Sequence, residues 1–251
     1  MMSFCAADTA SGKWNVADSP RASGFKVKVK PAWRPDRILA IEKAKAFEAY
    51  LAQLEKAADT TILSFKQLVA ALQKRHDYFD ANGCSLSDHG LDFFYAEPYT
   101  DQGIEAIFMK ARIGKELTEQ EVKKYRSAML YELAAMDARS GWVQQFHLGA
   151  NRNNNRRMFH LLGADTGFDA IGDQPIASSM NAFFSRLDSE GLLAKTIVYN
   201  LNPKDNEMLV ANAYNFNDGS VPGKMQYGAA WWFLDQQDGI RRQLDALSRL
   251  G

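Results

Sequence analysis

The stretch KTIVYNLNPKDNE, residues 195–207, joins a strand pattern to the start of a helix. β-Branched residues stand at the centre of its first half, which favours a β-strand. Asn202 and Pro203 are residue types preferred at the N-cap and first position of a helix, and Asp205 stabilises the positive end of that helix. The stretch therefore predicts one β-α unit.

The same succession recurs along the chain. Further strand patterns lie near residues 25, 86, 144 and 226, and helical patterns separate them. Repeated β-α units imply a parallel sheet with right-handed crossovers, so the expected fold class is α/β. Polar clusters follow the strand patterns, as in a (β/α) barrel, whose active site lies at the carboxyl ends of its strands.

The helical patterns have readable boundaries. One pattern covers residues 37–57, and a second begins at Ser64, where an S-x-x-Q capping box is predicted. Residues from about 98 to 141 carry helical patterns and are expected to be an inserted segment. A second capping box, of Thr118 with Glu121, lies inside this segment.

Composition restricts the function classes. Lys+Arg and Asp+Glu both number 30, so the net charge is zero, which disfavours non-specific binding to nucleic acid or anionic membranes. The two cysteines have no metal-type spacing, and residues 1–24 contain no apolar segment typical of a secretory signal. No run approaches the ~18 apolar residues that span a bilayer. We therefore expect a soluble cytoplasmic protein without nucleic-acid or membrane partners.

Two of the predicted strands contain histidines that are candidate site residues. His147 lies at the end of the pattern 141–149, where a ring nitrogen can bind a metal, although zinc usually needs about three or four ligands. A hydrogen-bonded structural histidine is the competing interpretation. Asp88 and His89 are neighbours in another strand pattern, so their side chains are expected on opposite faces of the sheet. Either they belong to a functional site, or Asp88 stands in a turn and His89 is a hydrogen-bonded residue of the core.

Arginines, amides and tryptophans are the other candidates. Arg34 suits a carboxylate, which arginine binds with two hydrogen bonds, but a structural pair with Asp36 is equally compatible with the sequence. Arg152 and the Asn153 amide run offer donors and acceptors for a polyhydroxylated ligand, or else cap the next helix. Trp231 and Trp232 lie in a strand pattern at 224–233, so one can stack on a ligand while the other fills the core.

Six stretches of the sequence together resemble one known protein family. They are WRPD (33–36), SDHG (87–90), GWVQQFHLGANRNNNRRMF (141–159), LLGADTGFDAIGD (161–173), YNLNPKDNE (199–207) and YGAAWWFLDQQDG (227–239). Together they closely resemble the uronate isomerases, also called glucuronate isomerases, a divergent branch of the amidohydrolase superfamily. The similarity extends over most of residues 25–251.

The resemblance implies a partial (β/α)₈ TIM-type barrel with an inserted helical segment. Residues 25–251 would form this incomplete barrel domain, and residues 1–24 a poorly ordered or remnant N-terminal segment. It further implies a hexuronate substrate and interconversion of D-glucuronate with D-fructuronate and of D-galacturonate with D-tagaturonate. A divalent metal, commonly zinc, would stabilise the enediolate oxygen. A homo-oligomeric state is left open.

The resemblance also assigns residues. His147 is similar to the metal-facing histidine of a mid-barrel strand, and Arg34 to an arginine that holds the substrate carboxylate. Arg152 and Asn153 would line the pocket, and Trp231 or Trp232 would form its wall.

The sequence departs from the family pattern at both ends. The His-x-His of the first strand does not occur in the sequence, and the T-D-S-R strand, with the expected acid/base aspartate, would follow residue 251. The alternative hypothesis is therefore a catalytically inactive, truncated uronate isomerase.

Overall fold

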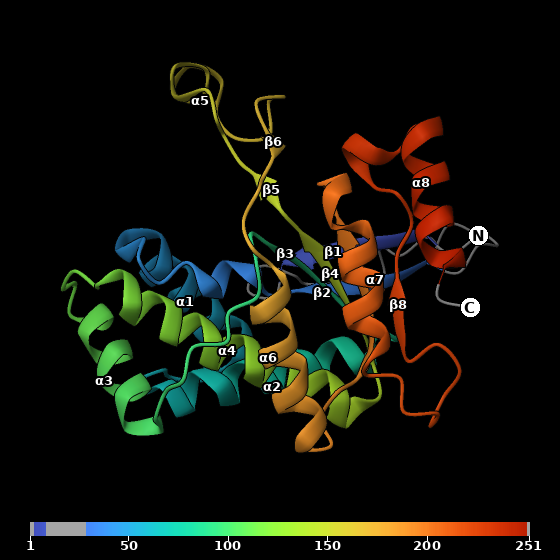
Figure 1. Cartoon of the computed structure of the whole chain (residues 1–251). Coiled ribbons are helices and arrows are strands. Elements are labelled where there is room, and N and C mark those ends of the chain that lie inside the picture. Colours follow the sequence, from blue (N-terminus) through green and yellow to red (C-terminus); the bar gives the residue numbers. More distant parts are fainter. Residues whose placement is uncertain (1–2, 9–28, 250–251) are drawn as a thin grey trace. The chain divides into compact units, whose positions relative to one another are not determined.

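The computed structural model describes residues 3–8 and 29–249 (Figure 1). The chain forms two compact units. The first comprises the chain up to His89, Tyr95–Gln144 and Gly191–Ala194, and the second comprises Gly90–Phe94, Gln145–Glu190 and the chain from Lys195 onward.

A parallel sheet supplies the framework, with helices between its strands. Its strands are β1 (Ser3–Asp8), β2 (Val29–Arg34), β3 (Leu86–Leu91), β4 (Val143–Leu148), β7 (Lys195–Asn200) and β8 (Met225–Tyr227), in the spatial order β1-β2-β3-β4-β7-β8. The recorded pairings of β1 with β2, β2 with β3 and β7 with β8 are all parallel. Each strand lies beside its predecessor in the sheet, as in a (β/α) barrel, whereas a doubly wound sheet reverses its order. The predicted α/β class and barrel-type arrangement are confirmed.

Strand β1 lies within residues 1–24, which were expected to be a poorly ordered or remnant N-terminal segment. It pairs with β2 over its whole length, from Ser3 opposite Val29 to Asp8 opposite Arg34. Residues 9–28, including the start of the strand predicted near residue 25, lie outside the described residues.

The first unit contains most of the predicted helical segments. They are the 3₁₀ turn η2 (Asp36–Leu39) and the helices α1 (Ala44–Ala58), α2 (Phe65–Ala81), α3 (Asp101–Arg112) and α4 (Glu119–Ser140). The single helix predicted at 37–57 was wrong, because the chain turns between η2 and α1. Side chains of α4 take the carbonyl bonds that a continuous helix would use: Tyr125 Oη donates to Ile38 O at 3.2 Å, and Arg126 Nε donates to Leu39 O at 3.0 Å.

Both predicted helix caps, at Thr118 and Ser64, are present in the structure, the second with one altered bond. Thr118 Oγ1 accepts from Glu121 N at 3.2 Å and Glu121 Oε2 accepts from Thr118 N at 2.7 Å, so this capping box is confirmed. Ser64 Oγ accepts from Gln67 N as predicted, but Gln67 Oε1 accepts from Leu63 N instead of Ser64 N. The second helix therefore begins where the sequence placed it, with a shifted reciprocal bond.

A buried polar cluster ties strand β3 to helices α2 and α4. Asp137 of α4 accepts from Ser87 Oγ at 2.6 Å, and its other carboxylate oxygen lies 3.1 Å from His76 Nε2. All three side chains are buried. The ring of Trp142 stacks on His76 with a centroid distance of 3.8 Å. The cluster holds β3 in register directly before Asp88.

Cys84 lies between α2 and β3 and is also buried. Its Sγ donates to Leu86 O at 3.2 Å. Burial raises the pKa of the Cys84 thiol to about 11. The side chain is therefore an uncharged thiol at neutral pH.

The second unit has its own core and further elements. These are β5 (Ala150–Asn151), α5 (Arg156–Leu162), β6 (Ala170–Ile171), α6 (Ala177–Ser189), η3 (Pro203–Asp205), α7 (Asn206–Tyr214), η4 (Trp232–Leu234) and α8 (Gln237–Ser248). Phe94, Phe146, Phe183 and Phe184 pack as one aromatic cluster with centroid distances of 5.0–6.3 Å. As predicted, Asn202 caps a helical turn with Pro203 at its start, but this turn is the 3₁₀ η3 and α7 begins after it.

An arm formed by β5, α5 and β6 follows β4. The two short strands pair antiparallel, and Asn155 Oδ1 caps α5 by accepting from Met158 N at 3.1 Å. Helix α5 buries none of its side chains, and the arm extends away from α6 and α7 (Figure 1). The Asn run therefore does cap a helix, as one of the two interpretations predicted.

The last strand ends earlier than predicted. The sequence suggested a strand over 224–233, but β8 stops at Tyr227. The side chain of Gln243 in α8 explains this difference, because its Oε1 accepts from Ala230 N at 2.8 Å and its Nε2 donates to Gly228 O. These bonds replace the ladder bonds that a longer strand would form.

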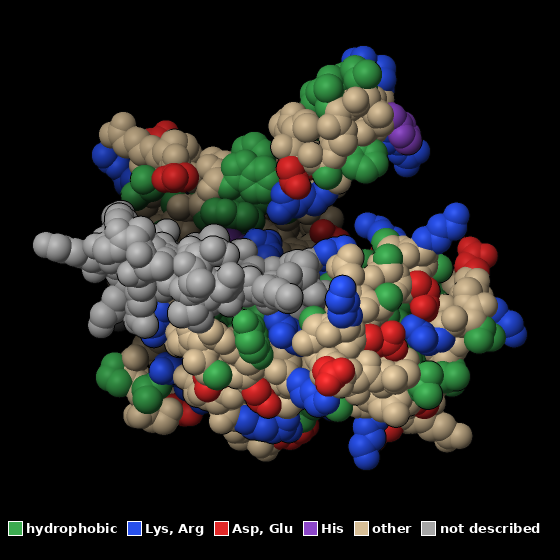
Figure 2. All heavy atoms as spheres, turned by 180° about the vertical axis from the view of Figure 1, so that it is seen from behind, with side chains coloured by type: hydrophobic (Ala, Val, Ile, Leu, Met, Phe, Trp, Pro, Cys, Tyr) green, Lys and Arg blue, Asp and Glu red, His purple; other side chains and the backbone are tan. Residues whose placement is uncertain are grey.

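The surface carries charges of both signs. On the face in Figure 2, Lys and Arg side chains alternate with Asp and Glu side chains instead of gathering by sign. This mixture agrees with the zero net charge of the sequence. Among the described helices, none is both long and apolar enough to span a bilayer.

Candidate active site

Arg34 lies at the carboxyl end of β2 and faces two carboxylates of the same unit. Its Nη1 lies 3.1 Å from Asp88 Oδ2, and its Nε lies 3.7 Å from Asp36 Oδ2. The Arg34 side chain is 40% exposed, so solvent reaches the guanidinium. The structural pair with Asp36 that the sequence allowed is present, and Asp88 adds a closer partner.

His89 extends this cluster into the core. Its Nδ1 lies 2.8 Å from Asp36 Oδ1, and its side chain is only 1% exposed. Burial acts to lower the pKa of His89, but the hydrogen bond to Asp36 and the charges of Asp36, Asp137 and Asp88 outweigh it, so the pKa is raised. Although Asp88 and His89 are adjacent in a strand, Asp88 contacts Arg34 at the end of β2 and His89 contacts Asp36 at the start of η2.

Replacement of His89 by glutamine should destabilise the protein most at acidic pH. Because the folded state raises the pKa of His89, the stabilisation is complete below the ordinary value of ~6.5 and is lost as pH rises through the raised value. A charge-assisted hydrogen bond of this kind contributes about 1.5–3 kcal/mol. Urea unfolding of both proteins near pH ~5 and near pH ~9 measures the difference.

His160→Gln in the exposed part of α5 is the matched control and should keep the pH dependence of the wild type. An equal loss for His89→Gln at both pH values would contradict a protonated His89–Asp36 pair.

In the second unit, His147 of β4 lies among aromatic rings. It stacks on Tyr199 of β7 with a centroid distance of 4.4 Å and an interplanar angle of 5°, and Trp231 approaches edge-on at 4.5 Å. Tyr199 Oη donates to Gln145 Oε1 at 2.8 Å, which fixes its ring. A Cβ at Gly228 would lie 2.2 Å from the Tyr199 ring, so glycine is required there for this stack.

Arg152 and Asn153 lie at the base of the arm. Asp169 holds both, because its Oδ2 lies 2.7 Å from Arg152 Nη1 and its Oδ1 accepts from Asn153 N at 2.8 Å. Burial acts to raise the pKa of Asp169, but these bonds lower it below its usual range. The Arg152 guanidinium also lies 5.0 Å from the ring centroid of Trp232, a cation–π distance.

The two tryptophans have different surroundings. Trp231 packs against His147, whereas Trp232 is 38% exposed and stacks on Phe233. Trp232 has a positive φ of 51°, an uncommon conformation for a bulky residue. The expectation that strand alternation separates them was wrong, because η4 and not β8 contains Trp232.

Asn200, the last residue of β7, belongs to a buried polar network with Asn206 and Tyr227. Asn200 Nδ2 donates to Asn206 Oδ1 at 2.9 Å, and Tyr227 Oη lies 2.6 Å from Asn200 Oδ1. Burial raises the pKa of Tyr227. These residues hold β7, α7 and β8 together.

A metal centre needs more than His147. Within residues 3–8 and 29–249, no three His, Cys, Asp or Glu side chains lie close enough to hold a metal ion. The ring of His147 packs against both Tyr199 and Trp231. The described residues therefore do not fit a complete metal centre, and no reaction step is assigned to one.

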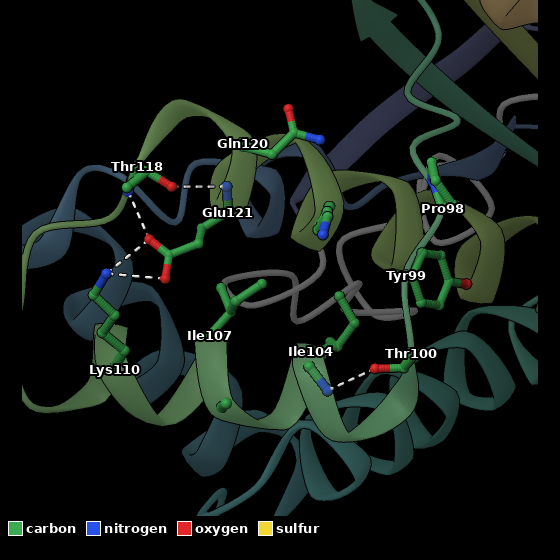
Figure 3. A pocket seen from close by; sticks show the side chains of 12 residues that line it. Pro98, Tyr99, Thr100, Ile104, Ile107, Lys110, Thr118, Gln120 and Glu121 are labelled. Carbon is green, nitrogen blue, oxygen red and sulfur yellow. Dashed lines mark hydrogen bonds and ion pairs between the residues drawn. The ribbon is translucent and has the colours of Figure 1, made fainter.

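A cavity of about 660 Å³ lies elsewhere, between α3 and α4. Ile104 and Ile107 point from α3 into it, and the pair of Lys110 with Glu121 lies at one end (Figure 3). None of the site residues predicted from the sequence lines this cavity. Its lining residues lie between Pro98 and Lys124, within the segment that was predicted to be an insertion.

The structure thus groups the predicted residues within each unit. His147 contacts Trp231, and Arg152 contacts Trp232, all in the second unit, whereas Arg34 belongs to the first. Sequence reasoning missed the roles of Asp169 and Tyr199. Asp169 lies within the quoted LLGADTGFDAIGD motif, but nothing local indicated its partners, which lie 16 and 17 positions away.

Comparisons with known proteins converge on one family. A family model described as glucuronate isomerase matches residues 6–251. A uronate isomerase of Phocaeicola vulgatus is 54% identical over 231 residues, covering 92% of this chain and 49% of that protein. One of Cellvibrio japonicus is 52% identical over 244 residues, covering 97% of this chain and 51% of that protein.

Solved structures agree. A uronate isomerase of Thermotoga maritima has a TM-score of 0.89 at 26% identity, covering 99% of this chain and 53% of that one. A glucuronate isomerase of Caulobacter crescentus has a TM-score of 0.84 at 23% identity, covering 98% and 50%, and so supports the fold. The chain spans about half the length of the curated relatives it matches.

Proposed function

This chain belongs to the glucuronate isomerase family, and from that premise we propose that it acts in the aldose–ketose isomerisation of hexuronates. The proposed substrates are D-glucuronate and D-galacturonate, converted to D-fructuronate and D-tagaturonate. The observation that carries the proposal is the family match over residues 6–251. The proposed setting is the cytoplasm.

Arg34 is the proposed ligand of the substrate carboxylate. It lies at the carboxyl end of β2, where barrel enzymes place their active sites, and its guanidinium is partly exposed. A guanidinium can bind a carboxylate with two parallel hydrogen bonds. Arg34 would therefore fix the acid end of the sugar.

Arg152, Asn153 and Trp231 are the proposed pocket residues of the second unit. Asp169 orients Arg152 and the Asn153 backbone, so both are held before a ligand arrives. Trp231 offers a flat apolar wall beside His147. Such walls suit the C–H faces of a sugar, while the amide groups suit its hydroxyls.

The proposed reaction transfers a proton from C2 to C1 of the sugar and the hydroxyl proton from O2 to O1. A base removes the proton at C2, an enediolate forms, and a proton returns to C1. None of the described residues is assigned the role of this base. No step of this reaction is assigned to a metal; zinc, with His147 as one ligand, stays a prediction from the family resemblance.

Turnover by the purified 251-residue protein tests this function. We expect D-glucuronate and D-galacturonate, with zinc present, to yield ketose products that a coupled reductase detects. Arg34→Ala should raise KM by about 10- to 100-fold with little change in kcat, because the carboxylate contact is the same before and during the reaction.

Arg112→Ala is the control. It breaks the ion pair of Arg112 in α3 with Glu48 in α1 and should leave KM unchanged. No turnover of either sugar with zinc present would contradict the proposal and favour the inactive alternative.

A further inference from the structure

The cavity between α3 and α4 has the size and the apolar floor of a small-molecule site. Its volume is about 660 Å³, within the range of about 300–1,000 Å³ that is usual for ligand pockets. Ile104 and Ile107 of α3 form the floor, and Pro98 and Tyr99 line the cavity from the loop before α3 (Figure 3). All the lining residues belong to the first unit.

The walls of this cavity are fixed by local bonds. Thr100 Oγ1 accepts from Gly103 N at 3.1 Å at the start of α3, and Thr118 Oγ1 accepts from Glu121 N at 3.2 Å at the start of α4. Lys110 Nζ donates to both carboxylate oxygens of Glu121, at 2.7 and 2.9 Å, and so ties the two helices together. The cavity is therefore shaped before a ligand arrives, which lowers the entropic cost of binding.

The charges that line the cavity do not cancel. Lys110 is neutralised by Glu121, and Lys123, the neighbour of Lys124 on α4, is neutralised by Glu119 at 2.6 Å. Lys124 itself is half-buried and lines the cavity, and it has neither an ion pair nor a hydrogen bond with any other residue that the structure describes. The lining thus keeps one positive charge in excess.

These two properties together select the chemistry of a ligand. An anionic group can pair with the ammonium of Lys124 where burial reduces the competition from water. The floor of Ile104 and Ile107 offers apolar contacts and no hydrogen bonds, so it favours an aliphatic or aromatic body over the hydroxyl groups of a sugar. Glu97 accepts from Gln120 at 3.0 Å but is not a lining residue.

We propose that the cavity between α3 and α4 binds a small monocarboxylate with an apolar body, and that Lys124 holds its carboxylate. The site is separate from the residues proposed for the hexuronate, because none of them lines this cavity. Its ligand also differs in kind, since the hexuronates carry hydroxyl groups where this cavity offers apolar side chains.

A titration of the 251-residue protein followed by NMR tests the site, with isoleucine δ1 methyl groups labelled. Hexanoate is the probe, hexanamide its neutral match, and D-gluconate its polyhydroxylated match. Hexanoate should shift the methyl signals of Ile104 and Ile107 saturably while that of Ile171 on the arm stays in place. Hexanamide should bind at least about fivefold more weakly, and D-gluconate should leave both signals unmoved.

Three variants assign the binding to this cavity. Lys124→Gln should weaken hexanoate binding by about fivefold to tenfold, because it removes the charge that pairs with the carboxylate. Lys123→Gln is the matched control, because it removes the adjacent lysine, which pairs with Glu119, and should stay within about twofold of the wild type. Ala106→Trp, at an exposed lining position of α3, should fill the cavity and abolish the shifts.

The results that overturn the proposal are equally specific. One is the absence of a saturable shift at Ile104 and Ile107 in the wild type. Others are equal binding of hexanamide, or of D-gluconate, and undiminished hexanoate binding in Lys124→Gln or in Ala106→Trp. Because the readout is binding and not turnover, a failure of the proposed isomerase activity leaves this result unaffected, and the reverse also holds.

Discussion

Asp137→Ala is expected to lower the free energy of unfolding by about 3–5 kcal/mol, because it removes the common partner of two buried groups. Asp137 accepts from Ser87 Oγ at 2.6 Å and lies 3.1 Å from His76 Nε2, and all three side chains are buried. Without the carboxylate, the hydroxyl and the imidazole lose their partner where water cannot replace it. Urea unfolding followed by circular dichroism measures the loss.

Glu119→Ala is the matched control on the same helix. The Glu119 side chain is 82% exposed and pairs with Lys123 across one turn of α4, so its removal should change stability by less than about 0.5 kcal/mol. Equal effects of the two substitutions would show that Asp137 does not anchor β3 to α2 and α4.

Phe184→Ala should destabilise the second unit by a similar amount. Phe184 is fully buried on α6 and packs against Phe94 at 5.1 Å and Phe216 at 5.6 Å. Removing a buried phenyl ring loses its transfer free energy and leaves a cavity, at a cost of about 3–5 kcal/mol. Thermal and urea unfolding should both report the change.

Phe159→Ala provides the comparison in the same unit. Its ring is 40% exposed on α5, a helix without buried side chains, so the substitution should cost less than about 1 kcal/mol. A small loss for Phe184→Ala, close to that of Phe159→Ala, would mean that the aromatic cluster is not the core of this unit.

Local signals were sufficient for most elements of the fold. The capping box of Thr118 with Glu121 and the β-branched centre of residues 195–200 are short-range patterns, and the structure has both where they were predicted. Where the prediction failed, a distant side chain had replaced local bonds. Tyr125 interrupts the helix predicted at 37–57, and Gln243 ends the strand predicted at 224–233.

The candidate site, too, could be predicted only in part. Arg34, Arg152 and His147 could be singled out from the sequence as candidates, although each also had a structural interpretation. Their partners could not be read, since Asp88 lies 54 positions after Arg34 and Tyr199 lies 52 positions after His147. The neutralisation of Arg34 by Asp88 therefore came from the structure alone.

The buried thiol of Cys84 can report local opening of the fold. Its thiol is buried with a pKa of about 11, and the thiolate is the form that alkylating reagents attack. Alkylation at neutral pH therefore has to wait until the junction of α2 and β3 opens, and the labelling rate of Cys84 counts those openings. Because Cys84 lies only two positions before the first residue of β3, its reactivity reports how often the strand that carries Asp88 leaves its place.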